Sequence, residues 1–128
     1  MTVSGSGQEH RPRAFVIEDD VQTQRLLADL IASRGLEPVP FSRLSSARRA
    51  LHERPPQVMI VDDDLPDGKG AELVRELRAD SRLCDIQVLF CTAADGARRR
   101  EMARLAPVVA KPFALNDMER ALAEVVSH

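Results

Sequence analysis

The chain has 128 residues, the length of one ordinary domain, and a formal net charge of -2 from 18 basic and 20 acidic residues. Hydrophobic residues make up 44% and charged residues 30%, a composition that excludes a disordered or membrane-embedded protein. The near balance of charge gives no support to nucleic-acid binding. Cys84 and Cys91 match neither a disulfide framework nor a zinc site, so we expect reduced thiols in a cytoplasmic protein. We expect a flexible tail at residues 1–12 and one domain at residues 13–128.

Short apolar runs alternate with longer amphipathic stretches along the chain. Four runs have the length and the β-branched content that are typical of strands buried on both faces, and they occupy residues 14–17, 58–61, 88–91 and 108–110. A weaker candidate at residues 37–41 contains Pro38 and Pro40. Because proline has no amide hydrogen to donate, we expect this strand at the edge of a sheet.

Apolar residues at helical spacing predict five helices, at residues 21–34, 46–53, 69–79, 97–105 and 115–126. Gly35 is expected to end the first helix, and Asn116 with Glu119 predicts a capping box at the start of the last. The order is a strand followed by a helix, five times over. This order predicts an α/β fold in which a parallel sheet lies between two layers of helices.

Reactive side chains follow the four strong strands. Glu18 and Asp19 come after the first run, Asp62 after the second, Thr92 after the third and Lys111 after the fourth. The carboxyl ends of parallel strands meet at one edge of the sheet, where α/β proteins bind ligands. Crowded carboxylates cannot all ionise comfortably, and Mg²⁺, which prefers oxygen ligands, relieves that conflict. An aspartate beside Mg²⁺ and a lysine predicts a site that accepts a phosphoryl group.

The segments around these strand ends resemble the receiver domains of response regulators, including the chemotaxis receivers. The resemblance runs from Phe15 nearly to the C-terminus and rests on Val-Ile-Glu-Asp-Asp at 16–20, Val-Asp-Asp-Asp-Leu-Pro-Asp-Gly-Lys-Gly at 61–70, Thr-Ala at 92–93 and Lys-Pro-Phe at 111–113. It implies a flavodoxin-like (βα)5 three-layer sandwich with a five-stranded parallel sheet of order 2-1-3-4-5. That order would place the strand with the two prolines at an edge.

The resemblance implies a role for each residue. Asp62 would be the phosphoacceptor, because Pro66 follows it by the family's four residues. Thr92, 30 residues after Asp62, would bond the phosphoryl oxygens, and Lys111 would pair with them. The peptide bond between Lys111 and Pro112 would be cis.

The resemblance also implies a magnesium site and partners. Glu18, Asp19, Asp62 and the backbone carbonyl of Asp64 would hold Mg²⁺, with Asp19 as the expected direct ligand. A sensor histidine kinase or a histidine phosphotransfer protein would supply the phosphoryl group. Because only residues 114–128 follow the lysine motif, we expect output through a downstream protein target, a relay to a histidine phosphotransfer domain or drainage of phosphate from a kinase. We expect no direct contact to nucleic acid or membrane. We expect a monomer or a weak dimer.

Three features depart from the family. Lys111 lies only 19 residues after Thr92, fewer than usual, which shortens the fourth helix or the loop after it. Val108 stands where most receivers carry Tyr or Phe, so the usual output face formed by the fourth and fifth helices is altered. Asp64 lies two residues past the acceptor. We expect its side chain to point at the site and to change the lifetime of the phosphoryl group.

Several charged residues are expected to have no role in the site. Solvated turn residues are predicted at Asp20, Asp63 and Asp67, and a solvent-facing helix side at Arg98, Arg99 and Arg100. Cys91 is expected to belong to the core beside the site.

Two other functions compete with the phosphoacceptor switch. Asp62 and Asp64 also fit the Asp-x-Asp signature of phosphatases of the haloacid-dehalogenase type, but that signature usually lies on the first strand of a longer chain. A degenerate receiver that serves only as a protein-binding module is the other alternative, and the intact acidic, threonine and lysine set argues against it. We therefore expect that the protein is not an enzyme and that it catalyses only its own phosphorylation and dephosphorylation.

Overall fold

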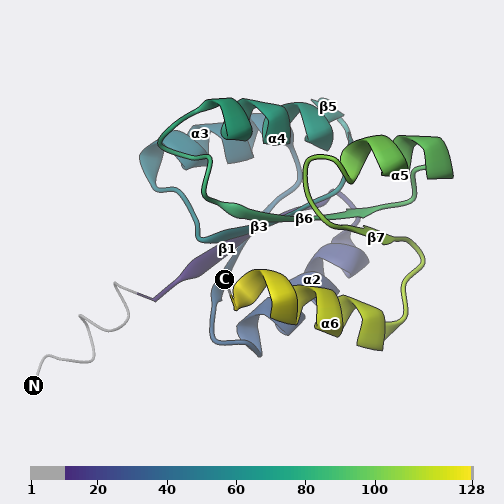
Figure 1. Ribbon diagram of the computed structural model, residues 1–128. Coiled ribbons are helices and arrows are strands. Elements are labelled where there is room, and N and C mark those ends of the chain that lie inside the picture. Colours follow the sequence, from purple (N-terminus) through teal and green to yellow (C-terminus); the bar gives the residue numbers. More distant parts are fainter. Residues whose placement is uncertain (1–10, 128) are drawn as a thin grey trace, which may run out of the picture.

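The computed structural model describes residues 11–127, and the part of the predicted tail at residues 1–10 lies outside the described residues (Figure 1). A central parallel sheet has the order β2-β1-β3-β6-β7. Its strands are β1 (Arg13–Ile17), β2 (Glu37–Phe41), β3 (Val58–Val61), β6 (Gln87–Thr92) and β7 (Val108–Ala110). Counted along the chain as the five strands of this sheet, the order is 2-1-3-4-5, so the predicted flavodoxin-like topology is confirmed.

Helices cover both faces of the sheet and complete the predicted three layers (Figure 1). One face is covered by α3 (Leu44–Glu53), α4 (Gly70–Ala79) and α5 (Gly96–Met102), and the other by α2 (Val21–Ala32) and α6 (Leu115–Val126). Adjacent strand residues point to opposite faces, so Phe15 and Ile17 pack under α3 and α4 while Val16 packs under α2 and α6. Strands buried on both faces explain the continuous apolar runs.

Local sequence explains the position of the edge strand and both ends of the first helix, α2. β2 lies at the edge, where Pro38 and Pro40 were predicted to place it. Asp20 caps α2, because its carboxylate accepts the amide of Thr23 at 2.9 Å. Gly35 follows α2 with a positive φ of 85°, the backbone conformation that glycine adopts most readily.

Two details near helix ends differ from the expectation. The capping box at Asn116 and Glu119 is wrong: α6 begins after Ala114, which has no side-chain cap bond, and Asn116 already lies inside the first turn. A short hairpin of β4 (Asp64–Leu65) and β5 (Gly68–Lys69) precedes α4, where the sequence predicted only a turn. A two-residue strand is too short to leave a periodic pattern in the sequence.

The helix after β6 is shorter than predicted. The helix expected at residues 97–105 ends at Met102, whereas β7 covers the predicted residues 108–110. The shortfall between Thr92 and Lys111 therefore falls on α5 and the turn that follows it. None of the helices in the described chain combines the length and the apolar character needed to cross a membrane.

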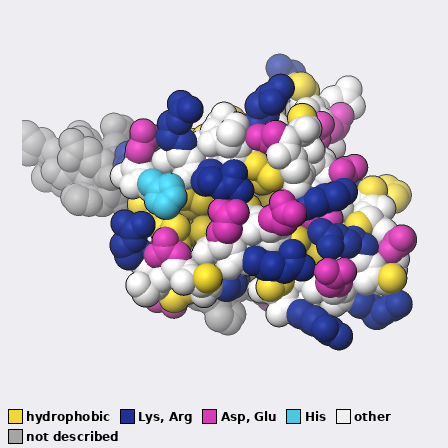
Figure 2. All heavy atoms as spheres, turned by 90° about the horizontal axis from the view of Figure 1, so that it is seen from above, with side chains coloured by type: hydrophobic (Ala, Val, Ile, Leu, Met, Phe, Trp, Pro, Cys, Tyr) yellow, Lys and Arg dark blue, Asp and Glu magenta, His cyan; other side chains and the backbone are white. Residues whose placement is uncertain are grey.

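The outer face over α3 and α4 carries basic and acidic side chains interspersed (Figure 2). Arg48 of α3 pairs with Glu76 of α4 at 2.9 Å, and Arg75 of α4 pairs with Glu101 of α5 at 3.2 Å. Each pair is about half exposed, so it contributes little to the free energy of unfolding. These pairs account for part of the mixed charge on this face.

Candidate functional site

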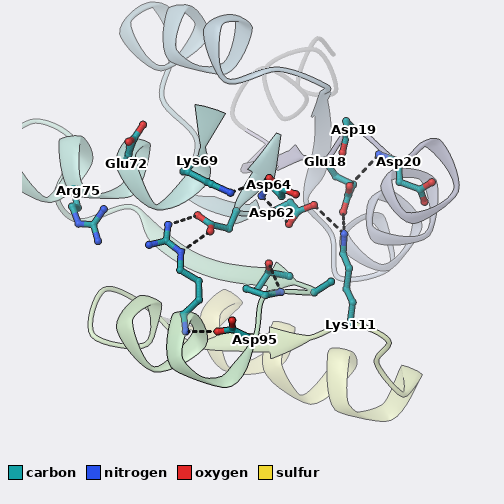
Figure 3. Close-up of a pocket in the computed structure, with 15 residues that line it drawn as sticks. Glu18, Asp19, Asp20, Asp62, Asp64, Lys69, Glu72, Arg75, Asp95 and Lys111 are labelled. Carbon is teal, nitrogen blue, oxygen red and sulfur yellow. Dashed lines mark hydrogen bonds and ion pairs between the residues drawn. The ribbon is translucent and has the colours of Figure 1, made fainter. Parts of the chain in front are cut away.

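The carboxyl ends of four strands bring the predicted site residues together (Figure 3). In the sheet, Ile17 lies opposite Val61, so Glu18 and Asp62 follow at the same level. Likewise, Thr92 lies opposite Ala110, and the amide of Lys111 donates to the Thr92 carbonyl at 2.8 Å. The resulting pocket has a volume of about 760 Å³. Its lining includes the predicted residues Glu18, Asp19, Asp62, Asp64, Thr92 and Lys111.

A lysine joins two buried carboxylates at the centre of the pocket. The Lys111 ammonium donates to Glu18 and, at 3.1 Å, to Oδ2 of Asp62. Both acidic residues are almost fully buried, at 1% and 7% exposure. Burial raises the pKa of Glu18, and the bonds from Lys111 and the Asp20 amide offset that rise only in part. Burial alone would lower the pKa of Lys111, but its bonds to the carboxylates outweigh burial, so the ammonium stays charged.

Three carboxylates are placed where they could hold a divalent cation. One oxygen each from Glu18, Asp19 and Asp62 lies within 4.8 Å of the others. Mg²⁺ takes oxygen ligands at about 2.1 Å, so ligands on opposite sides of the ion are about 4.2 Å apart and a small adjustment fits one ion. Both oxygens of Glu18 already accept bonds, one from Lys111 and one from the Asp20 amide at 3.0 Å. Both oxygens of Asp62 also accept bonds, but these are longer, from Lys111 at 3.1 Å and from the Asp64 amide at 3.3 Å. Asp19 is exposed, so it is the carboxylate most open to an ion.

Asp64 lies on the rim of the pocket, and its carboxylate turns to Lys69 (Figure 3). The two side chains pair at 3.0 Å because they stand opposite each other in the β4–β5 hairpin. The unpredicted hairpin thus pairs this carboxylate with Lys69 at the edge of the site, and its expected effect on the phosphoryl group stays a prediction. The backbone amide of Asp64 is directed at the site, where it lies 3.3 Å from Oδ1 of Asp62.

Thr92 is buried at the end of β6 with its hydroxyl at the start of the next loop. Its Oγ1 accepts the amide of Ala94 at 3.1 Å, while small Ala93 between them is exposed. Cys91 lies in the core as expected, and burial raises the pKa of its thiol to about 12. The buried thiol is therefore protonated and inert near neutral pH.

One pair of residues beside the acceptor escaped the sequence analysis. Asp63 is 3% exposed, not a solvated turn residue, and Arg98 binds both of its oxygens at 2.8 and 3.0 Å. Burial alone would raise the pKa of Asp63, but the Arg98 side chain and the Ala71 amide lower it below its usual value. Arg98 is therefore not part of a solvent-facing charge run. The only signal in the sequence was a third acidic residue directly after a buried strand.

The comparison with protein-family models decides the family. A model described as the response regulator receiver domain matches residues 14–123, most of the chain. The chain belongs to the response-regulator receiver family. Its receiver fold is also found in a sensor protein from Polaromonas sp. JS666, which is 31% identical, with 91% of this chain and 97% of that chain covered and a TM-score of 0.76.

Two other known proteins are similar to this chain. The phosphate regulon transcriptional regulatory protein PhoB of Escherichia coli is 30% identical over 81 residues, which cover 63% of this receiver and 35% of PhoB. This receiver therefore matches about a third of the length of that relative. The receiver domain of the sensor histidine kinase PA1611 from Pseudomonas aeruginosa shares the fold at 21% identity and a TM-score of 0.78, over 92% of this chain and 99% of that chain. Its structure is described with a magnesium ion coordinated in the active-site cleft.

The receiver keeps two other expected features at this end of the sheet. The Lys111–Pro112 peptide bond is cis. Val108 is half-buried and lines a second, smaller hollow of about 350 Å³ beside α5. Val108 thus lies at the surface beside α5, and the altered output face expected from it stays a prediction.

Proposed function

We propose that this receiver accepts a phosphoryl group on Asp62 from a histidine kinase or a histidine phosphotransfer protein, in a reaction that requires Mg²⁺. One observation carries the proposal. The Asp62 carboxylate is buried at the meeting point of three strand ends, where it is bonded to Lys111 and lies within 4.8 Å of the oxygens of Glu18 and Asp19. No ordinary structural role requires so many ionisable groups around one buried carboxylate.

The chemistry assigns each residue a task. A carboxylate oxygen of Asp62 forms a bond to phosphorus, while the phosphorus–nitrogen bond of the donor's phosphohistidine breaks and its electron pair leaves with the imidazole. Lys111 is placed to neutralise the charge of the phosphoryl oxygens, and the Thr92 hydroxyl to donate a hydrogen bond to one of them. Magnesium, when bound, would neutralise further charge on the same oxygens.

The residues that would hold the metal follow from the site. Asp19 and Asp62 would bind it directly, and the backbone carbonyl of Asp64 would complete the protein ligands. Glu18 would support the site through its bonds to Lys111 and Asp20. The magnesium described for the PA1611 receiver supports this assignment for a domain of the same fold. Hard oxygen ligands suit Mg²⁺ better than softer transition metals.

The proposed output is a change in the binding of a downstream protein. PhoB is named a transcriptional regulatory protein, but this receiver covers only about a third of it, so no such activity carries over. We infer that the domain works in the cytoplasm, where Cys84 and Cys91 stay reduced. In this proposal the domain catalyses its own phosphorylation and dephosphorylation and does not turn over a separate substrate.

Intact mass spectrometry after treatment with acetyl phosphate tests the proposal. Wild type with Mg²⁺ is expected to gain one phosphoryl group, whereas Asp62→Asn, or wild type with excess EDTA, gains none. Equal labelling of wild type and Asp62→Asn would contradict the proposal. A wild type that is never labelled would favour the degenerate receiver. Continuous release of phosphate from an ester would favour the phosphatase.

A further inference from the structure

Arg98 and Asp63 form a largely buried ion pair beside α5. The two nitrogens Nε and Nη2 of Arg98 bind the two oxygens of Asp63 at 2.8 and 3.0 Å, and the side chains are 27% and 4% exposed. A fork of this kind fixes the direction of the guanidinium as well as its position. Asp63 is also held by the backbone amide of Ala71 at 3.1 Å. The pair therefore rests on a rigid anchor at the start of α4.

The other attachments of helix α5 in the described chain are weaker and include the half-exposed pair between Glu101 and Arg75 of α4 at 3.2 Å. Among its seven residues, all in the described part of the chain, Met102 alone is fully buried. A helix this short has little stability of its own and depends on its tertiary contacts. Arg98 lies in its first turn, so its bonds to Asp63 fasten the end of α5 that follows the Thr92 loop.

The loop of residues 92–95 connects that fastened end to the site. The Ala94 amide donates to the Thr92 hydroxyl oxygen at 3.1 Å, and the Asp95 carboxylate accepts the Arg98 amide at 2.9 Å. Asp63 is the chain neighbour of the acceptor Asp62. The ion pair thus closes a loop of contacts that runs from the acceptor strand through α5 back to the Thr92 hydroxyl.

We propose that Arg98 is a positioning residue, which through buried Asp63 holds the 92–95 loop so that the Thr92 hydroxyl is ready for the phosphoryl group on Asp62. This inference rests on the proposed function. Arg98 acts through Asp63 and does not itself contact the phosphoryl group, because both oxygens of Asp63 occupy its fork. Loss of either partner has the same consequence, a loop that samples unproductive positions.

The rival role for Arg98 makes the opposite prediction. If Arg98 were a reserve cation for the phosphoryl group, Asp63→Asn would weaken its hold on Arg98 and would speed labelling or lengthen the phosphoryl lifetime. The positioning role predicts that Asp63→Asn and Arg98→Met both slow labelling by acetyl phosphate, by about 10- to 100-fold, since small displacements at a reacting centre cost rates of this order. The double variant should be no slower than the slower single variant, because both changes break one contact.

Arg100→Met is the matched control, because Arg100 lies on the same helix, is exposed and carries the same charge. Its labelling rate should stay within about twofold of wild type, as expected for a surface substitution. Arg98→Lys keeps the charge without the fork and should fall between wild type and Arg98→Met. Circular dichroism of each variant shows whether the fold persists, and a variant that loses its fold is replaced by Arg98→Gln.

Amide hydrogen exchange of the full chain without a phosphodonor separates this inference from the proposed function. Exchange over residues 93–102 should rise about tenfold or more in Asp63→Asn and Arg98→Met, and not in Arg100→Met. That result supports the positioning role even if wild type takes up no phosphoryl group, which would defeat the proposed function alone. Unchanged exchange over these residues, or faster labelling of Asp63→Asn, would overturn the inference.

Discussion

The two sides of the pocket differ in how deeply the elements that form them are buried. On one side, all four residues of β3 and four of the five residues of β1 are fully buried, and they place Glu18 and Asp62. On the other side, the three residues of β7 are half-buried and α5 buries one side chain, Met102, within the described chain. Under the proposed function, the buried carboxylates that would hold the metal, Glu18 and Asp62, stand on the more deeply buried side. Thr92 and Lys111, which would bond the added phosphoryl group, border the less buried one.

Two glycines test this contrast most strongly. A Cβ on Gly70 would lie 2.1 Å from the Asp62 carbonyl oxygen and 2.6 Å from a methyl group of Val61. A Cβ on Gly96 would meet only the flexible ends of two arginine side chains, at 3.5 and 4.0 Å. We expect Gly70→Ala to lower the free energy of unfolding by about 1–3 kcal/mol, because the added methyl group overpacks the site. Gly96→Ala is expected to be neutral or to stabilise by about 0.4–1 kcal/mol. Urea unfolding measures both, and equal losses would show that the two sides are equally tight.

The cap of α3 gives a smaller effect that depends on pH. The Asp67 carboxylate accepts the amides of Leu44 and Ser45 at 2.8 and 2.9 Å, and these bonds lower its pKa. Because the folded pKa lies below the unfolded one, the stabilisation is complete above the unfolded pKa of about 3.9 and is lost as pH falls through the folded pKa. Asp67→Ala should therefore be less stable than wild type at pH 7, and the difference should shrink towards pH 2.5.

A matched variant isolates the titration of this cap. Asp67→Asn keeps an acceptor oxygen for the two amides but cannot ionise, so its difference from wild type should also shrink as the pH falls, from a smaller starting value than that of Asp67→Ala. Urea unfolding at several pH values measures both variants. A difference between wild type and Asp67→Ala that stays constant from pH 7 to pH 2.5 would show that the charge of Asp67 has no part in fastening α3.

The smallest effect on stability is expected at Asp64, on the rim between the two sides. Its pair with Lys69 is largely exposed, so Asp64→Asn should change the free energy of unfolding by less than about 0.5 kcal/mol.

We still expect the Asp64 carboxylate to influence how long the phosphoryl group survives, because it borders the same pocket. Dephosphorylation followed by mass spectrometry compares wild type with Asp64→Asn, and Lys69→Met serves as the matched partner. Equal phosphoryl lifetimes in wild type and Asp64→Asn would show that the Asp64 carboxylate has no influence on dephosphorylation.

The parts of the molecule that the sequence predicted well share a physical basis. An abrupt change from a buried apolar run to an ionisable residue marks the end of a parallel strand, and the geometry of the sheet then brings those ends together. This reasoning, which needs only the order of residues along the chain, places Glu18, Asp62, Thr92 and Lys111 in one pocket, and the fold confirms it. Their roles in phosphoryl transfer stay predictions until the labelling experiments are done.

The parts that the sequence missed depend on contacts between distant residues or on exact helix ends. Asp63 and Arg98 are 35 residues apart, and nothing local to either residue reveals the other. The carboxylate of Asp64 turns to Lys69 because of a hairpin too short to leave a pattern. The capping box at Asn116 failed because the cap position of α6 is Ala114, two residues before it, a shift within the usual uncertainty of a predicted boundary.

The run of three aspartates at residues 62–64 sets the most direct test of the central claim. Borohydride reduces an aspartyl phosphate to homoserine, so peptide mass spectrometry after labelling and reduction identifies the acceptor residue. We expect homoserine at Asp62 alone, because only Asp62 of the three lies beside both Lys111 and the Glu18–Asp19 pair, whereas Arg98 binds both oxygens of Asp63 and the exposed Asp64 pairs with Lys69. Homoserine at Asp63 or Asp64 in the wild type would contradict it.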